Sequence, residues 1–163
     1  MAELTLRILT TADWPLWRDL RLAALADAPD AFKSRLADWP HGGEGRWRDR
    51  LHRPDAHHVA AFLDDTPVGI VDGLPGSPDG VRELRSLWVA PQARGRGVAD
   101  RLIEEVESWA RAVGGTTLLL AVLPGNVAAL ALYRRHGFAP LGEPGELLAD
   151  GVTRELLLAK PLR

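Results

Sequence analysis

The chain contains no cysteine, and this absence excludes disulfide bonds, thiolate metal sites and a cysteine nucleophile. The five histidines lack HExxH or a similar spacing, so the sequence does not indicate a zinc site. Basic residues are not in excess, because 20 of them face 22 acidic residues for a formal net charge of −2. Such a balance does not favour nucleic acid as a partner. We therefore expect a protein that binds neither a metal ion nor nucleic acid.

Long hydrophobic runs and targeting features are also lacking. The first residues are acidic and show neither the basic region nor the long apolar region of a secretory signal. The longest strongly apolar run, 116–123, is far shorter than the roughly 20 residues that span a bilayer. We expect a cytoplasmic protein that has no membrane partner.

What is present is the composition of a globular protein, with 163 residues, 46% hydrophobic and 26% charged. We assign residues 1–163 to a single domain. Hydrophobic periodicity predicts the order β-α-α-β-β-β-α-β-α-β-β, which is an α/β fold with a mixed sheet flanked by helices. The pattern bounds six of the seven strands and three of the four helices: strands at 4–8, 58–63, 68–73, 81–89, 116–123 and 153–159, and helices from 14 to a stop at Ala28 and Pro29, at 98–113 and at 126–136. Between 30 and 54 it predicts only a short irregular helix and a loop.

The most informative segment, Gln92-Ala93-Arg94-Gly95-Arg96-Gly97, joins the strand 81–89 to a helix. Glycines let a backbone approach a ligand and adopt positive φ, and the amides at a helix N-terminus bind anions. With the added charge of Arg94 and Arg96, the segment suits a pyrophosphate, although a plain strand-to-helix connection would use the same residues. It is neither a P-loop, since GxxxxGK[ST] is absent, nor a Rossmann loop, since Asp100 stands where GxGxxG needs a glycine.

A second segment contains the only asparagine of the chain, Asn126, and its only tyrosine, Tyr133. On a helix their spacing puts both side chains on one face, two turns apart. Asn126 could instead be a helix cap and Tyr133 a core aromatic residue.

Taken together and in this order, the two segments resemble the GCN5-related N-acetyltransferase (GNAT) superfamily. The first matches its [Q/R]-x-x-G-x-[G/A] loop. The second matches its N-x-x-A-x-x-x-Y-x-x-x-G-F helix at Asn126, Ala129, Tyr133, Gly137 and Phe138. With the strands that precede them, the resemblance covers nearly the whole chain. The segment 30–34 looks like the region that many members place over the acceptor site.

This resemblance implies a GNAT-like acyl-CoA N-acyltransferase fold and the transfer of an acetyl group from acetyl-CoA to a primary amine of a small molecule or peptide. It also implies that the strands ending at Val89 and Leu123 splay, so that the cosubstrate lies between them. The backbone of one strand would follow the pantetheine arm, the loop amides would hold the pyrophosphate, and the tyrosine would lie beside the sulfur. The cofactor-binding residues implied in this way are Leu87, Trp88, Val89, Arg94, Gly95, Arg96, Gly97, Val98, Ala99, Asn126, Ala129 and Tyr133.

Direct attack by an amine needs a base for the amine and an acid for the departing thiolate. A phenol of pKa near 10 is protonated at pH 7, so Tyr133 is our expected acid. We take Glu83 as the base, since a regular strand would put it on the face of Leu87 and Val89. Along an extended strand, Glu83 would lie about 13–20 Å from the thioester. It would therefore have to act through a chain of water molecules or on an acceptor that reaches back toward it. Alternatively, Glu83 forms an ion pair with Arg82 or Arg85.

Three other functions stay open at this stage: an acyl-CoA-binding protein of the same fold without turnover, a transferase for a longer acyl-CoA, and a nucleotide or RNA binder. The retained Tyr133 argues against the first. The charge balance and the missing P-loop pattern argue against the third. The family resemblance also allows a homodimer, whereas the sequence does not identify the amine acceptor.

Overall fold

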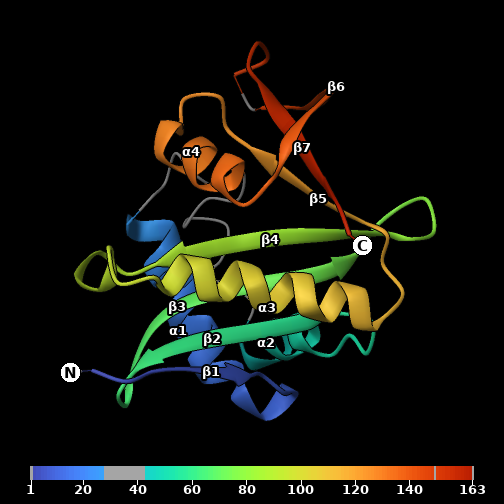
Figure 1. Cartoon of the computed structure of the whole chain (residues 1–163). Coiled ribbons are helices and arrows are strands. Elements are labelled where there is room, and N and C mark those ends of the chain that lie inside the picture. Colours follow the sequence, from blue (N-terminus) through green and yellow to red (C-terminus); the bar gives the residue numbers. More distant parts are fainter. Residues whose placement is uncertain (1, 28–42, 149, 163) are drawn as a thin grey trace.

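The computed structural model describes residues 2–27, 43–148 and 150–162. Its strands form one seven-stranded sheet with the order β1-β2-β3-β4-β5-β7-β6 (Figure 1). The strands are β1 (Leu4–Ile8), β2 (His57–Leu63), β3 (Thr66–Pro75), β4 (Val81–Val89), β5 (Thr117–Val122), β6 (Ala139–Leu147) and β7 (Arg154–Pro161). The helices are α1 (Trp14–Asp27), α2 (Gly43–Leu51), α3 (Val98–Ala112) and α4 (Val127–Arg135), with short 3₁₀ turns at Thr11–Asp13 and Pro91–Ala93.

The predicted order of elements and the α/β fold class are confirmed. The largest difference in bounds is at β3, which is two residues longer at each end than predicted. The helix α2 falls where the pattern predicted only a short irregular helix and a loop. The expected helix stop at Ala28 and Pro29 and the segment 30–34 lie outside the described residues.

Helix α3 lies directly on β3 because two glycines of that strand leave room for it. A Cβ atom at Gly73 would come within 2.6 Å of the Trp109 ring, and one at Gly69 would come within 3.2 Å of the Leu102 side chain. The face of α3 that packs here is apolar, with Val98, Leu102, Ile103, Val106 and Ala110 buried. Helices α1 and α2 cover the other face of the sheet (Figure 1). The sheet therefore has one helical layer on each side.

Strand β4 contains a β-bulge at Ser86, whose φ is +60°. Ile70 and Asp72 of β3 are two residues apart, yet their partners Trp88 and Arg85 are three apart. The extra residue in β4 shifts the in-and-out alternation of its side chains by one position. Arg85 and Trp88, although three residues apart, therefore both face α1.

This bulge corrects the prediction that Glu83, Leu87 and Val89 share one face. Glu83 lies on the α1 face with Arg85. Val89 pairs with Gly69, which faces α3, so Val89 and Leu87 lie on the opposite face. The prediction was wrong because it assumed an uninterrupted pleat between residues 83 and 89.

Strands β4 and β5 splay, as the resemblance implied. They pair in parallel only over Val81–Glu83 and Thr117–Leu119, whereas β5 pairs with β7 along its whole length. Beyond these three pairs the two strands diverge (Figure 1). The stretch 85–89 of β4 therefore has β3 on one side and no strand on the other among the described residues.

Within residues 2–27, 43–148 and 150–162, no helix is long and apolar enough to cross a membrane.

Candidate active site

The loop before α3 presents bare backbone to open space. Gly95 and Gly97 have φ of +78° and +79°, a region that only glycine adopts without strain. A Cβ atom added at either position would meet no atom within 4 Å. Gly97 is the N-cap of α3, and the first amides of a helix have no partner within it. These features together fit a bound anion such as a pyrophosphate.

We call the space in front of this loop the loop cavity. It is where the two sequence motifs meet, since the glycine loop, the end of β4 and helix α4 all border it. Its lining residues are Val89, Ala93, Arg94, Gly95, Gly97, Val98, Ala99, Asp100, Leu132 and Arg135. Arg96, also expected at the pyrophosphate, is exposed and is not among them.

The side chain of Arg94 fixes the loop to two other elements. It donates to the Asp27 carboxylate at the end of α1 (2.5 Å) and to the Val89 carbonyl (3.1 Å). Trp88 Nε1 donates to the same carboxylate at 2.9 Å. The hydrogen bond from Trp88, and then the one from Arg94, hold the pKa of Asp27 below its usual value. The Arg94 guanidinium is thus paired with protein groups, whereas the residue itself borders the loop cavity.

Asp100 ties the start of α3 to the end of α4. Its carboxylate accepts from Arg135 and lies 2.7 Å from His136 Nε2, with the Arg135 bond also at 2.7 Å. These two hydrogen bonds, the one with His136 first, lower the pKa of Asp100. The sequence motifs do not include this contact, which fixes the distance between the two helices that border the loop cavity.

Helix α4 begins at Asn126, whose side chain accepts from the Ala129 amide at 3.2 Å. Asn126 is therefore a helix cap, one of the two interpretations left open by the sequence. Tyr133 is 8% exposed and packs edge-on against Phe138, with ring centroids 5.8 Å apart. It is not among the residues that line the loop cavity. Burial raises the pKa of Tyr133, so its phenol stays protonated at neutral pH and is able to donate.

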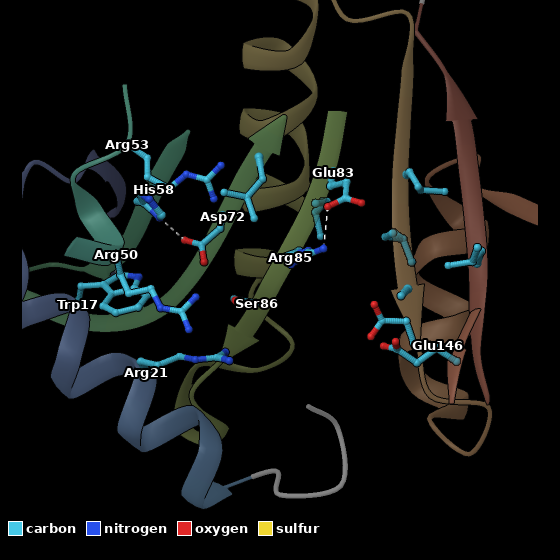
Figure 2. Close-up of a pocket in the computed structure, with 17 residues that line it drawn as sticks. Trp17, Arg21, Arg50, Arg53, His58, Asp72, Glu83, Arg85, Ser86 and Glu146 are labelled. Atoms are coloured by element: carbon cyan, nitrogen blue, oxygen red, sulfur yellow. Dashed lines mark hydrogen bonds and ion pairs between the residues drawn. The ribbon is translucent and has the colours of Figure 1, made fainter. Parts of the chain in front are cut away.

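A second cavity, of about 390 Å³, opens on the α1 face where β4 and β5 separate (Figure 2). We call it the charged cavity. Its lining residues are Trp17, Arg21, Arg50, Arg53, His58, Asp72, Leu74, Glu83, Leu84, Arg85, Ser86, Leu119, Leu120, Ala121, Glu146, Glu155 and Leu157. They come from eight of the eleven helices and strands, and from the residues just after α2.

Glu83 lines the charged cavity and forms an ion pair with Arg85 at 2.8 Å. The ion-pair interpretation of Glu83 is thus confirmed, and the structure does not bring this residue to the loop cavity. On the same side, His58 Nδ1 lies 2.7 Å from the Asp72 carboxylate, and both side chains are buried. Among the described residues, no group of three or more His, Cys, Asp or Glu is placed to hold a metal ion.

Beyond Glu83 and Arg85, the charged residues of the charged cavity were not predicted from the sequence. Arg21 lies on α1 and Arg50 on α2, whereas Glu146 and Glu155 come from β6 and β7 near the other end of the chain. No spacing in the sequence connects them, since only the fold brings them together.

The model of the Acetyltransferase (GNAT) family matches residues 17–138 of this chain. The chain is 35% identical over 112 residues to an IAA acetyltransferase of Azospirillum brasilense, which covers 69% of this chain and 72% of that protein. It is 32% identical over 146 residues to an aminoglycoside N(6')-acetyltransferase type 1 of Stenotrophomonas maltophilia, covering 82% and 85% respectively. The PaiA N-acetyltransferase of Thermoplasma acidophilum, solved in complex with coenzyme A, superposes with a TM-score of 0.75. That superposition covers 98% of this chain and 99% of that chain at 17% identity.

The chain belongs to the GNAT family. It has the acyltransferase fold of that family and is an N-acetyltransferase that transfers an acetyl group from acetyl-CoA to an amine. The resemblance found on the two motifs is confirmed.

Proposed function

We propose that this enzyme acetylates a primary amine of a small molecule or peptide by direct attack on acetyl-CoA, with both substrates bound at once. The observation that supports this proposal most is that residues 85–89 of β4 do not pair with β5. Val89 at one end borders the loop cavity, and Arg85 and Ser86 at the other border the charged cavity. A thioester held along this stretch would meet an amine that enters through the charged cavity.

The cosubstrate would be held mainly by backbone. The peptide groups of Leu87, Trp88 and Val89 would follow its pantetheine arm, and the amides of residues 94–99 would bind its pyrophosphate. The open space in front of Gly95 and Gly97 supports this assignment. Helix α4 would approach the same arm from the other side with Asn126 and Ala129.

Tyr133 would protonate the departing thiolate. Its raised pKa keeps the phenol protonated at neutral pH, so the phenol is able to donate a hydrogen bond and then its proton to the thiolate as the C–S bond breaks. Its place on α4, whose Leu132 and Arg135 border the loop cavity, supports this role.

Glu83 would take a proton from the incoming amine through water. The pairing of β4 with β3 puts Glu83 on the α1 face, where its side chain lines the charged cavity from which the amine would come. Leu87 lies four residues further along the strand, roughly 13 Å away, so the Glu83 carboxylate is too far for direct contact with the thioester and would act through water.

The protons balance in this scheme. The N–C bond forms, the C–S bond breaks, and the ammonium form of the acceptor loses two protons. Tyr133 gives its phenolic proton to the CoA sulfur and regains one of the two protons of the acceptor, and the other proton reaches solvent through Glu83. We extend the proposal on sequence grounds to one domain over residues 1–163 that acts in the cytoplasm, without nucleic acid and as a monomer or homodimer.

The test is to measure acetyl-CoA binding by calorimetry and then the release of free CoA with a panel of primary amines. We expect binding, followed by release that depends on the amine and on both substrates together. Binding without release from any amine would favour an acyl-CoA-binding protein without turnover. A better rate with a longer acyl-CoA would favour the other alternative.

A further inference from the structure

The charged cavity has one strongly cationic side. Arg21 reaches it from α1 and is only 7% exposed, and Arg50 reaches it from α2. Arg53 follows α2 and Arg85 comes from β4. Partial burial of its guanidinium, and then the charges of neighbouring arginines, lower the pKa of Arg50. Several guanidinium groups therefore lie close enough together to repel one another.

Among the described residues that line this side, the arginines outnumber the carboxylates. Asp72 lies near Arg21 and Arg50, and its carboxylate is 2.7 Å from His58 Nδ1. Glu83 is held by Arg85. Among the described lining residues from α1 to β4 there are thus four arginines and two carboxylates. An added anion would relieve the repulsion between the arginines.

The opposite side of the cavity has the other sign. Glu146 of β6 and Glu155 of β7 line it, and no described lining residue from β5, β6 or β7 is basic. Figure 2 shows Glu146 across the cavity from Arg21 and Arg50, with β4 between them. The cavity therefore separates positive from negative charge, and the gap between β4 and β5 lies in between.

We propose that the acceptor is an amine that also carries a carboxylate, as an amino acid or a short peptide does. The planar guanidinium groups of Arg21 and Arg50 bind that carboxylate, for which their paired donors are well suited. The acceptor's amino group then points away from the arginines, toward the gap between β4 and β5, where Glu146 and Glu155 favour a cation. This inference rests on the proposed function, since it names the substrate class of the same site.

The test compares matched acceptors that differ only at the acid group. Each amino acid is assayed beside its carboxamide and beside the amine that lacks the group. A hydrogen-bonded charge pair is lost in both analogues, so we expect kcat/KM to fall roughly 10- to 100-fold, mainly through KM. Calorimetry with CoA-loaded protein gives a second readout, because the N-acetylated acid should bind more tightly than its amide.

Arg50→Gln should reduce this preference for the acid at least several-fold while acetyl-CoA binding stays unchanged. Arg50 is exposed on α2, so the substitution does not disturb the core. Arg48→Gln is the matched control, because Arg48 lies on the same helix, pairs with Glu44 at 3.1 Å and does not line the cavity. Arg21→Lys, which keeps the charge of the buried group but not its paired donors, should weaken the preference as well.

Equal use of acids and amides would overturn the inference and leave the acetyltransferase activity intact. So would an unchanged preference in the Arg50→Gln protein, or a preference for a phosphorylated amine over the carboxylate. Failure of the proposed function has a different signature, namely bound acetyl-CoA and no CoA release with any amine, acidic or neutral.

Discussion

The loop cavity and the charged cavity border the same short stretch of β4, yet they are built in opposite ways. Seven of the ten residues that line the loop cavity lie within 93–100, and the features that fit a ligand there are glycine backbone and a helix N-terminus. The charged cavity is lined by side chains from both ends of the chain. A site made of contiguous backbone can be recognised from a short motif, whereas a site made of distant side chains cannot.

The largest effect should come from Tyr133, which belongs to neither lining and would serve the chemistry itself. Tyr133→Phe removes the proton donor and keeps the ring packed against Phe138. We expect kcat to fall by roughly 10²- to 10⁴-fold with little change in the affinity for acetyl-CoA. Steady-state kinetics and calorimetry on the same protein check this. Full turnover in the variant would show that another group or water protonates the thiolate.

Gly97→Val tests the loop cavity alone. The new side chain would project into the open space before the loop and would force a β-branched residue to φ of +79°. Loss of hydrogen bonds to a charged phosphate should weaken acetyl-CoA binding by roughly 10- to 100-fold.

Gly114→Val at the other end of α3 is the matched control. Gly114 has φ of +82° and equally open surroundings, so the variant has the same backbone strain at a place where no ligand is expected. Both variants should lose stability in thermal unfolding, and only Gly97→Val should lose affinity. Equal affinity of the two folded variants would remove the pyrophosphate from this loop.

Glu83→Gln tests the charged cavity, with a smaller expected effect because solvent can also accept the proton. We expect about a tenfold lower kcat/KM and a flatter acidic limb in its pH profile. Arg85→Gln breaks the same ion pair but keeps the carboxylate, so it should retain that limb. If both variants behave like the parent, Glu83 is an ion-pair partner only, and another group deprotonates the amine.

The smallest expected effect is on stability at alkaline pH. Burial raises the pKa of Tyr133 above its unfolded value near 10, so the neutral phenol is favoured in the fold. Its contribution is complete below pH 10 and decreases as the pH rises toward the folded pKa. The free energy of unfolding should therefore fall above pH 10 in the parent and less so in Tyr133→Phe. As the only tyrosine, Tyr133 can be titrated directly by ultraviolet difference absorbance.

The sequence predicted the order of elements, the cap at Asn126 and the glycine turn before α3, because each depends on neighbouring residues. It did not predict the bulge, since Ser86 adopts φ of +60° without the glycine or asparagine that usually marks such a position. Nor did it predict that Arg21, which interrupts the buried face of an otherwise ordinary amphipathic helix, lines the charged cavity. Both depend on contacts between segments far apart in the chain.

The bulge at Ser86 also has a consequence for how this enzyme can evolve. Because the alternation of β4 shifts there, substitutions at 83 and 85 alter the side of the sheet that holds the charged cavity. Substitutions at 87 and 89 alter the side that faces α3. If the proposed roles hold, the two sides of this one strand can change nearly independently, so acceptor preference can change while cosubstrate binding is kept. Loss of the single codon for Ser86 would exchange the two faces at once, so this position should tolerate replacement far better than deletion.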